Sequence, residues 1–400
     1  MKRIFPNQAE AIANSLYAIL VEKKRASRVL EKCIDEHPKW GSRDRKILYE
    51  ACFNILRWKR KYYFIAAQEN GDFTPWPLIK TWCILHDYTL PDWDELDCPP
   101  YQSKSELNDL LISDEAIAHS YPDWLYHLGK KELKQEWRNE ASALNFQADV
   151  ALRVNRLVAS PKKTVQLLKE RFNIDTTLSD LNPDTLLLSK GRRLGNNQLF
   201  QKGYFEIQDA NSQLIAPFCQ VEPGMYVMDL CAGAGGKTLH LAALMRNQGE
   251  IKAFDVEANK LRELHRRSKR AKVSIIKTEL ITSTSTLEKH TKWADRLLVD
   301  APCSGLGTLK RNPEIKWNLD EGQLIAYQET QRKLLSKAAP LIQPKGKLIY
   351  ATCSILPSEN ENQIDWFIKE NPEFKLEEEI KISADSSKFD GFYMARLTRE

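Results

Sequence analysis

The sequence predicts a multidomain protein with an α-helical N-terminal domain, a small α/β module and a larger C-terminal α/β domain. A length of 400 residues is enough for two or three domains. Apolar residues recur at helical spacing over residues 8–63, whereas strand and helix patterns alternate from about residue 208 onwards. Hydrophobic residues make up 42% and charged residues 28%, which is typical of globular proteins and excludes disorder and a disulfide miniprotein.

The N-terminal domain is expected to be helical and basic. Residues 1–63 contain 15 Lys and Arg and 7 Asp and Glu, a net charge of +8, and Ser42 is a candidate helix cap. Residues 64–150 contain 6 Lys and Arg and 16 Asp and Glu, a net charge of −10. The total charge of +5 therefore conceals a basic N-terminal region followed by an acidic segment. Residues 86–105 contain three prolines and are expected to form a loop.

A small α/β module is expected after a helical stretch over residues 122–147. The expected elements of this module are a strand in 151–159, a helix over 161–172, and short strands at 185–189 and 203–207. The C-terminal domain then alternates strands with helices, which favours a mostly parallel sheet covered by helices on both faces. Its expected strands are 225–230, 251–255, 273–277, 296–300 and 347–351, and its expected helices include 238–246 and 259–272.

A glycine-rich loop joins the first strand of the C-terminal domain to a helix. It contains Cys231, Ala232, Gly233, Ala234, Gly235, Gly236 and Lys237. A Walker A loop would need glycine where Cys231 stands, and the glycine spacing also fails the dinucleotide fingerprint. Asp255 ends the next strand, 19 residues after Gly236, where an acid can accept both ribose hydroxyls of a nucleoside. The loop and Asp255 therefore favour a nucleoside ligand without a pyrophosphate, such as S-adenosylmethionine.

Two cysteines follow two strands of the same sheet. Cys303 comes after Asp300-Ala301-Pro302, and Cys353 comes after Tyr350-Ala351-Thr352. Ligands of open α/β sheets gather at the carboxyl ends of the strands. A thiolate that adds to C6 of a cytosine makes C5 nucleophilic enough to take a methyl group, and Asp300 is a candidate acid at N3. The spacing does not decide which cysteine attacks.

The remaining sequence features bear on the compartment and on other partners. No apolar signal region follows the basic start, no apolar run approaches a membrane span, and no Cys-x-x-Cys pair is present. We therefore expect a cytoplasmic protein with no metal site and no membrane partner.

Three segments resemble the signature motifs of the RsmB/Sun family of RNA cytosine-C5 methyltransferases. These segments are 228–238, 300–305 and 350–354, and further similar segments are 203–209, 311–317, 356–361 and 390–396. The resemblance covers roughly residues 120–400. Segments 42–50 and 55–58 are similar to the NusB-like RNA-binding domain of the bacterial ribosomal-RNA members, whereas residues 64–110 match nothing in the family. The resemblance implies a NusB-like domain over 1–140, an RRM-like module over 141–207 and a Rossmann-like methyltransferase domain over 208–400.

The resemblance implies a role for each matched residue. Cys353 is the nucleophile at C6, Cys303 assists product release, and Asp300 contacts the base and the cofactor. The implied S-adenosylmethionine site consists of Cys231, Ala232, Gly233, Ala234, Gly235, Gly236, Lys237, Asp255, Glu279 and Asp300. The sequence departs from the family pattern at Ala234, where the family has proline, and at Glu279, which is the nearest acid after the third strand where the family often has Asp.

The expected macromolecular substrate is RNA, with ribosomal RNA, most simply 16S, favoured over transfer RNA. Basic side chains attract phosphates, and neighbouring aromatic rings can stack on unpaired bases. The candidate RNA-binding residues are Lys237, Arg311, Lys316, Arg43, Arg45 and Arg57. The alternatives are a transfer-RNA methyltransferase, a DNA cytosine methyltransferase and a non-catalytic RNA-binding assembly factor. We expect a monomer.

Overall fold

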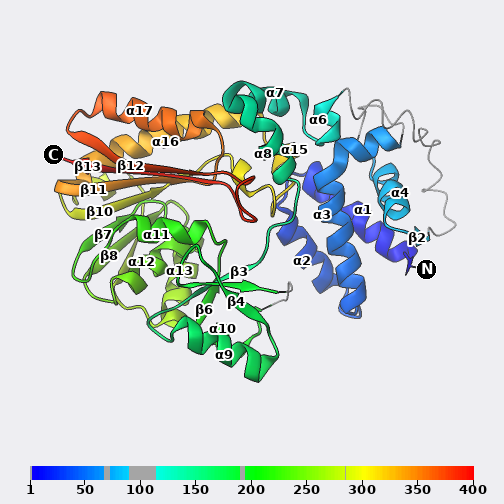
Figure 1. Ribbon diagram of the computed structural model, residues 1–400, viewed down its shortest axis with the longest axis horizontal. Helices are drawn as coiled ribbons and strands as arrows, with labels where there is room; N and C mark the ends of the chain where they lie inside the picture. Colours follow the sequence, from blue (N-terminus) through cyan, green and yellow to red (C-terminus); the bar gives the residue numbers. More distant parts are fainter. Residues whose placement is uncertain (1, 67–72, 90–113, 190–193, 284) are drawn as a thin grey trace. The chain divides into compact units, whose positions relative to one another are not determined.

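The computed structural model describes residues 2–66, 73–89, 114–189, 194–283 and 285–400 (Figure 1). The chain forms two compact units. The first unit comprises Met1–Phe146 and Leu309–Glu321, and the second comprises Gln147–Thr308 and Gly322–Glu400. The sequence pattern predicts residues 309–321 as part of the C-terminal domain, whereas in the structure they belong to the first unit.

The first unit is helical, as expected. Its elements are α1 (Pro6–Leu20), α2 (Ala26–Glu36), α3 (Ser42–Ile65), α4 (Trp76–Leu85), α6 (Glu115–Ala118), α7 (Asp123–Leu133), α8 (Trp137–Ala143), α15 (Ile315–Asn318) and the short parallel strands β1 (Lys2–Arg3) and β2 (Tyr88–Thr89). Helix α3 begins at Ser42, and the cap is Gly41 rather than Ser42, because the Asp44 carboxylate accepts a hydrogen bond from Gly41 N at 2.9 Å. Residues 90–105 of the expected loop lie outside the described residues.

The second unit begins with a small antiparallel sheet of order β4-β5-β3-β6. Its elements are β3 (Ala151–Val154), α9 (Pro161–Phe172), β4 (Thr176–Leu178), β5 (Thr185–Leu188), α10 (Gln198–Gln201) and β6 (Phe205–Ile207). Helix α9 begins where expected, since Pro161 fits the first helical turn and Ser160 Oγ accepts a hydrogen bond from Lys163 N at 3.3 Å. Strand β4 was not predicted, because it is only three residues long and carries no clear alternation.

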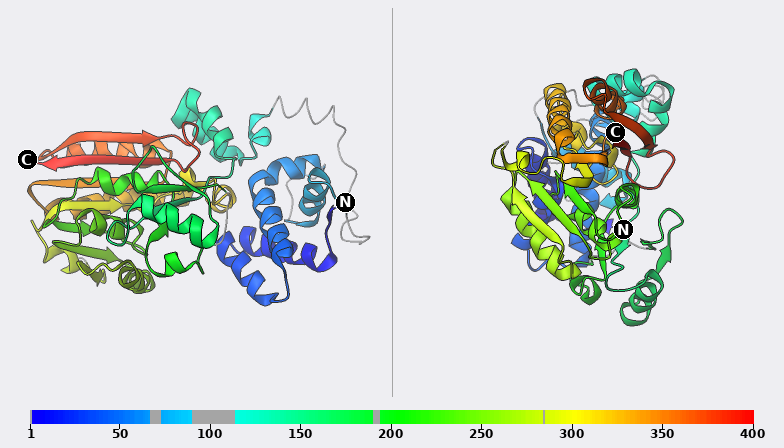
Figure 2. Two further views of the ribbon diagram at one scale, coloured as in Figure 1. Left: turned by 60° about the horizontal axis from the view of Figure 1, so that its bottom comes forward. Right: turned by 90° about the vertical axis from the view of Figure 1, so that its left-hand side faces the viewer.

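The rest of the second unit is built on a seven-stranded sheet of order β12-β13-β11-β10-β7-β8-β9. Strands β11, β10, β7, β8 and β9 run parallel, and β13 is antiparallel to β11 and β12. The strands are β7 (Tyr226–Asp229), β8 (Glu250–Asp255), β9 (Ile276–Leu280), β10 (Ala294–Asp300), β11 (Ile342–Thr352), β12 (Phe374–Ile382) and β13 (Phe392–Arg399). The β12–β13 pair forms one edge of this sheet (Figure 2).

Helices cover both faces of the sheet, as predicted (Figure 1). They are α11 (Ile215–Phe218), α12 (Gly236–Leu244), α13 (Ala258–Ala271), α14 (Ser285–Glu288), α16 (Glu321–Ala338) and α17 (Glu361–Glu370). Residues of α11, α12 and α13 share one apolar core with the sheet, and residues of α16 and α17 share another. The strand order reverses between β7 and β10, and ligands of such sheets bind at the carboxyl ends of the strands beside this point.

Helix α13 holds the small module against the larger sheet. Glu206 on β6 is buried and accepts hydrogen bonds from Arg267 at 2.8 Å and from Arg270 at 2.5 Å. Asn155 Nδ2 donates to Ala271 O at 2.8 Å and to Gly203 O at 3.0 Å. Arg267 and Arg270 therefore serve the packing of the small module.

Within the described ranges, none of the helices is long and apolar enough to cross a membrane. In the same part of the chain, no three His, Cys, Asp or Glu side chains are grouped as metal ligands.

Candidate active site

The glycine loop connects β7 to α12 at the carboxyl ends of the strands. Gly235 has a φ of +86° and directly precedes α12, and a Cβ at this position would lie 1.9 Å from Leu264 Cδ1. Both the backbone conformation and the close approach of α13 therefore require glycine here. A Cβ at Gly233 would meet nothing within 4 Å, so the loop is open at this point.

Asp255 ends β8 beside this loop. Its Oδ2 accepts a hydrogen bond from Gly233 N at 2.9 Å, and its Oδ1 accepts one from Glu257 N at 2.8 Å. Each carboxylate oxygen has a second lone pair, so Asp255 can also accept a ligand hydroxyl. Val256 follows directly and is 70% exposed, although it is apolar. Val256 was not predicted as a site residue, and its position after the acid at the strand end was the only signal for it in the sequence.

Glu279 lies on β9 and is held by basic neighbours. It accepts hydrogen bonds from Lys289 and, at 3.2 Å, from His290 Nε2. Burial alone would raise the pKa of Glu279, but these two hydrogen bonds outweigh it and lower the pKa. A ligand contact by Glu279 would therefore compete with two existing partners.

Lys237 and Asp300 form an ion pair where α12 begins and β10 ends. Lys237 Nζ donates to Asp300 Oδ2 at 2.5 Å, and both side chains are largely buried. Burial alone would lower the pKa of Lys237, but the Asp300 carboxylate and the nearby Cys353 outweigh it and raise the pKa. Lys237 is therefore a charged ammonium group near Cys353. Asp300, the candidate acid at N3, is thus paired with Lys237.

The two cysteines that follow β10 and β11 are in contact. Cys303 Sγ lies 3.3 Å from Cys353 Sγ, and both residues are partly exposed. The hydrogen bond to Cys353, together with burial, holds the pKa of the Cys303 thiol well above its ordinary value. Cys33, Cys52, Cys83 and Cys219 are buried elsewhere, as inert cysteines would be.

Glu359 joins the two cysteine loops, and it was not predicted as a site residue. Its Oε1 accepts hydrogen bonds from Ser304 N at 2.9 Å and Gln331 Nε2 at 3.0 Å. Its Oε2 accepts hydrogen bonds from Ser304 Oγ and Ser354 Oγ, each at 2.5 Å. Because Ser304 follows Cys303 and Ser354 follows Cys353, one carboxylate fixes the residue next to each thiol. The only signal in the sequence was its place in the matched segment 356–361.

The six candidate RNA-binding residues are divided between the two units and differ in exposure. Lys237 lies in the site just described, and Arg43 is exposed at the start of α3. Arg45 is partly exposed and donates to Trp40 O at 3.1 Å, and Arg311 is partly exposed.

Arg57 and Lys316 require a correction, because both are buried. Arg57 is 7% exposed and donates from Nη2 to Lys310 O at 2.9 Å. Lys316 is 1% exposed, and its Nζ donates to Arg57 O, Ser120 O and Asn145 Oδ1 at 2.8 to 2.9 Å. These two basic side chains are held in the interior of the helical unit, so neither is an exposed phosphate-binding group.

The fold and the site together define a nucleoside-binding α/β protein with a pair of thiols at the strand ends. The sheet is of the type that binds nucleosides at its strand ends, and a pair of thiols lies there beside a lysine–aspartate pair. No phosphate-binding loop of the Walker type is present in this part of the chain.

Comparisons with known proteins agree with this class. The 16S rRNA methyltransferase RsmB/F family matches residues 218–398, and the ferredoxin-like domain of RsmF/B-like methyltransferases matches residues 121–194. The probable ribosomal RNA small subunit methyltransferase B of Synechocystis sp. is 34% identical over 285 residues, which cover 69% of this chain and 64% of that protein. The ribosomal RNA small subunit methyltransferase B of Pasteurella multocida is 33% identical over 310 residues, which cover 74% and 69%. The fold is similar to that in the crystal structure of PH0851, with a TM-score of 0.80 and 24% sequence identity. The superposition covers 99% of this chain and 100% of that chain.

The chain belongs to the RsmB/F family of S-adenosylmethionine-dependent methyltransferases. The resemblance read from the sequence is thereby confirmed, as is the combination of a helical region, a ferredoxin-like module and a Rossmann-like domain.

Proposed function

We propose that this protein transfers a methyl group from S-adenosylmethionine to C5 of a cytosine in 16S ribosomal RNA. The observation that carries the proposal is the contact between Cys303 and Cys353 at the strand ends, next to the Lys237–Asp300 pair. Membership of the RsmB/F family supports the methyl donor and the ribosomal substrate.

The strand ends of β7 and β8 fit the methyl donor. The glycine loop brings backbone close to a ligand, Asp255 has lone pairs left for the ribose hydroxyls, and the exposed Val256 can be covered by the adenine. When bound, S-adenosylmethionine supplies an electrophilic methyl group. The chain's own residues position it and prepare the cytosine.

The first step is addition of the Cys353 thiolate to C6 of the cytosine. A bond forms between Sγ and C6, and the electrons of the C5–C6 double bond move so that C5 becomes nucleophilic. The Lys237 ammonium places positive charge near Cys353, and the Lys237–Asp300 pair supplies the hydrogen bond at N3. The target base must leave its stack, because the faces of C5 and C6 are covered in a helix.

The second step is release of the product. After C5 has taken the methyl group, a base takes the C5 proton, the electrons of that C–H bond re-form the C5–C6 double bond, and Cys353 leaves C6 as a thiolate. Cys303 promotes this elimination from its position 3.3 Å from the departing sulfur. This assignment gives both cysteines a task, whereas a DNA-type mechanism would leave one of them without a role.

Trapping the covalent intermediate tests these assignments. Cys303→Ala is expected to accumulate a protein–RNA adduct, seen as a slowly migrating band on a denaturing gel, because elimination fails. Cys353→Ala is expected to abolish both the adduct and methylation. Accumulation of the adduct by Cys353→Ala instead would reverse the roles of the two cysteines.

Bisulfite sequencing of total RNA with and without the protein tests the substrate. Protection of a cytosine in 16S ribosomal RNA is expected. Protection confined to a transfer RNA would move the activity to that substrate. S-adenosylmethionine binding without protection of any cytosine would favour a non-catalytic assembly factor.

A further inference from the structure

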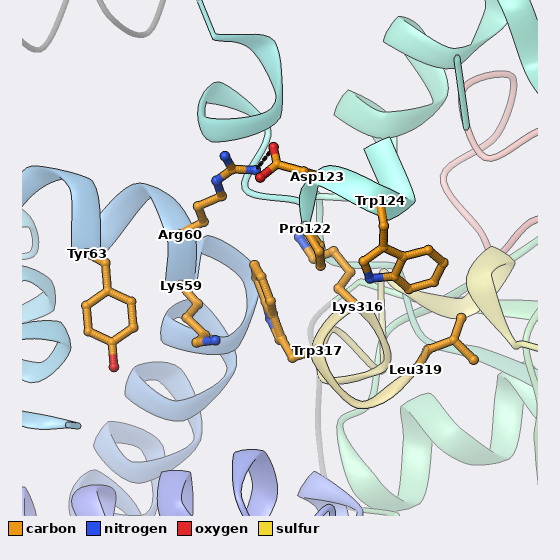
Figure 3. Close-up of a pocket in the computed structure, with 9 residues that line it drawn as sticks. All are labelled: Lys59, Arg60, Tyr63, Pro122, Asp123, Trp124, Lys316, Trp317 and Leu319. Carbon is orange, nitrogen blue, oxygen red and sulfur yellow. Dashed lines mark hydrogen bonds and ion pairs between the residues drawn. The ribbon is translucent and has the colours of Figure 1, made fainter. Parts of the chain in front are cut away.

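The helical unit contains a pocket of about 310 Å³ that is separate from the thiol site (Figure 3). Lys59 and Tyr63 of α3, Trp124 at the start of α7, and Trp317 from the segment 309–321 line it. All of these residues belong to the first unit. The volume lies at the lower end of the range of small-ligand pockets, about 300–1,000 Å³, so it suits a single flat group rather than a helix.

The pocket contains one cation that lacks an acceptor. Lys59 Nζ lies 4.5 Å from the ring centre of Trp317 and 5.9 Å from that of Tyr63. Within the described residues, Lys59 has no hydrogen-bond or ion-pair partner. Burial, with a smaller effect of Lys23, lowers the pKa of Lys59 to about 8. Its ammonium group is therefore still charged at neutral pH and has donors available.

The other basic groups of the pocket are already satisfied. Arg60 Nη1 donates to Tyr121 O and to Asp123 Oδ1, each at 2.7 Å. The Nζ of Lys316 has three acceptors, as described above. Asp123 is paired with Arg60, so the pocket offers a ligand aromatic surface and the donors of Lys59.

We propose that this pocket binds an unpaired nucleobase of the RNA substrate. The base packs against the indoles of Trp124 and Trp317, and its ring nitrogen or carbonyl oxygen accepts a hydrogen bond from Lys59. Aromatic stacking suits every base, and the lysine satisfies a polar edge that an apolar side chain would lack. A phosphate alone would leave the rings unused. The inference rests on the proposed RNA substrate and adds a second contact to it, distinct from the target cytosine.

Two substitutions test the pocket without disturbing its frame. Lys59→Met removes the charge and keeps an unbranched side chain, and Trp124→Ala removes a partly exposed ring. Trp317 is unsuitable, because its Nε1 donates to Leu56 O at 2.6 Å and its ring packs on the core. The matched controls are Lys39→Met and Tyr17→Ala, which remove an exposed lysine and a half-exposed ring of the same unit outside the pocket.

The measurement is the anisotropy of labelled single-stranded and duplex RNA oligonucleotides bound to the full chain. Stacking is worth about 1–3 kcal/mol per base, and a hydrogen bond to a charged group about 1.5–3 kcal/mol, so each pocket variant is expected to weaken single-strand binding by at least about fivefold. Duplex binding and both controls are expected to change by less than about twofold. Equal losses for duplex and single strand, or no loss in either variant, would overturn the proposal.

Two further readouts separate this inference from the proposed function. In methyl transfer, the pocket variants are expected to raise KM for RNA and to leave kcat within about twofold. If the unaltered protein methylates RNA and the pocket variants leave KM unchanged, the pocket proposal alone is overturned. If the pocket variants lose oligonucleotide binding but the unaltered protein methylates no RNA, the methyltransferase proposal alone is overturned. Crosslinking of 4-thiouridine RNA to the unaltered chain is expected at Tyr63, Trp124 or Trp317. Displacement of the RNA by an acidic peptide without any such crosslink would assign the pocket to a protein partner.

Discussion

Glu359 shows how a charged side chain can serve the site without contacting substrate. It is fully buried, and its carboxylate accepts four hydrogen bonds from Ser304, Ser354 and Gln331. Hydrogen bonds to a buried charge are stronger than neutral ones, and an unsatisfied group costs about 1–3 kcal/mol. We therefore attribute the spacing of Cys303 and Cys353 to Glu359.

Glu359→Gln is expected to loosen the two cysteine loops, because an amide NH₂ would face hydroxyl groups that now donate. The expected result is a loss of about 1–3 kcal/mol of stability and a fall of at least tenfold in the rate of adduct formation, since small misplacements of reacting groups cost large factors. Thermal unfolding and the gel assay measure the two effects. Glu370→Gln, at an exposed position on α17, is the control. An adduct rate equal to that of the parent would refute the role of Glu359.

The raised pKa of buried Asp229 leads to a specific predicted dependence of the free energy of unfolding on pH. Its side chain is buried at the end of β7, where Oδ2 accepts a hydrogen bond from Thr238 Oγ1 at 2.7 Å, and burial raises its pKa from 3.8 to about 7. The folded protein thus holds a proton that the unfolded chain releases near pH 3.8. The stabilisation from this proton is complete below pH 3.8 and is lost as the pH rises through about 7.

Asp229→Asn removes this titration. Relative to the variant, the parent is expected to lose stability between pH 5 and pH 7 by up to about 1.4 kcal/mol per pH unit. Urea unfolding midpoints at pH 5, 6, 7 and 8 measure the difference, with Asp365→Asn, an exposed carboxyl on α17, as the control. A constant difference between variant and parent across this range would contradict the prediction.

The residues predicted from the sequence were those whose position follows from the end of a strand. Cys303, Cys353, Asp300 and Asp255 all come at such ends, so topology alone brings them to one edge of the sheet. Lys316 could not be placed in this way, because its burial depends on carbonyl groups of Arg57 and Ser120 that lie far away in the sequence. A lysine is usually expected at the surface, but the three acceptors around the ammonium group of Lys316 allow it to be buried.

At the scale of elements, the glycine loop contains glycines required for two different reasons: a positive φ angle and a close approach to a neighbouring helix. The sequence alone does not distinguish these reasons. Gly233 and Gly235 both have positive φ, at +54° and +86°, but only Gly235 approaches α13 closely. The left-handed conformation costs a non-glycine residue about 1–2 kcal/mol. Steric overlap in a packed site typically adds about 1–3 kcal/mol.

Gly235→Ala is therefore expected to destabilise the second unit more than Gly233→Ala, by about 1–3 kcal/mol, because Leu264 must move. It is also expected to weaken S-adenosylmethionine binding, since the start of α12 shifts with the loop. Urea unfolding and calorimetric titration measure the two effects. Equal effects of the two substitutions on stability would show that the contact with Leu264 is relieved without cost.

The elements with strong apolar patterns were predicted well, and those formed by pairing were not. Strands β7, β8, β10 and β11 fall within or around the expected segments, because buried parallel strands have continuous apolar runs. The expected strand at 273–277 is found at Ile276–Leu280, and β12 (Phe374–Ile382) was not predicted. Most of β12 is exposed and charged, so its strand conformation comes from antiparallel pairing with β13 rather than from its own sequence pattern.

At the scale of the whole molecule, the chain leaves the second unit after Thr308 and returns to it at Gly322. Between these points it completes the helical unit. Lys316 donates to three acceptors in the first unit, Trp317 donates to Leu56 O, and Glu314 accepts a hydrogen bond from Ala26 N at 3.1 Å. The neighbours of this segment in the chain belong to the second unit, so its position in the sequence does not indicate that it packs in the first unit.

This arrangement predicts that residues 1–146 do not form a fully stable unit by themselves. Without residues 309–321, the carbonyl groups of Arg57 and Ser120 lose their donor, and the surface under Trp317 is exposed to water. Loss of a buried aromatic side chain alone typically costs about 3–5 kcal/mol. A fragment of residues 1–146 joined by a flexible linker to 309–321 is therefore expected to be at least about 3 kcal/mol more stable than 1–146 alone in urea unfolding. The same fusion carrying Lys316→Ala and Trp317→Ala is expected to lose most of this gain. Equal stability of the fragment with and without the segment would mean that the helical unit does not depend on it.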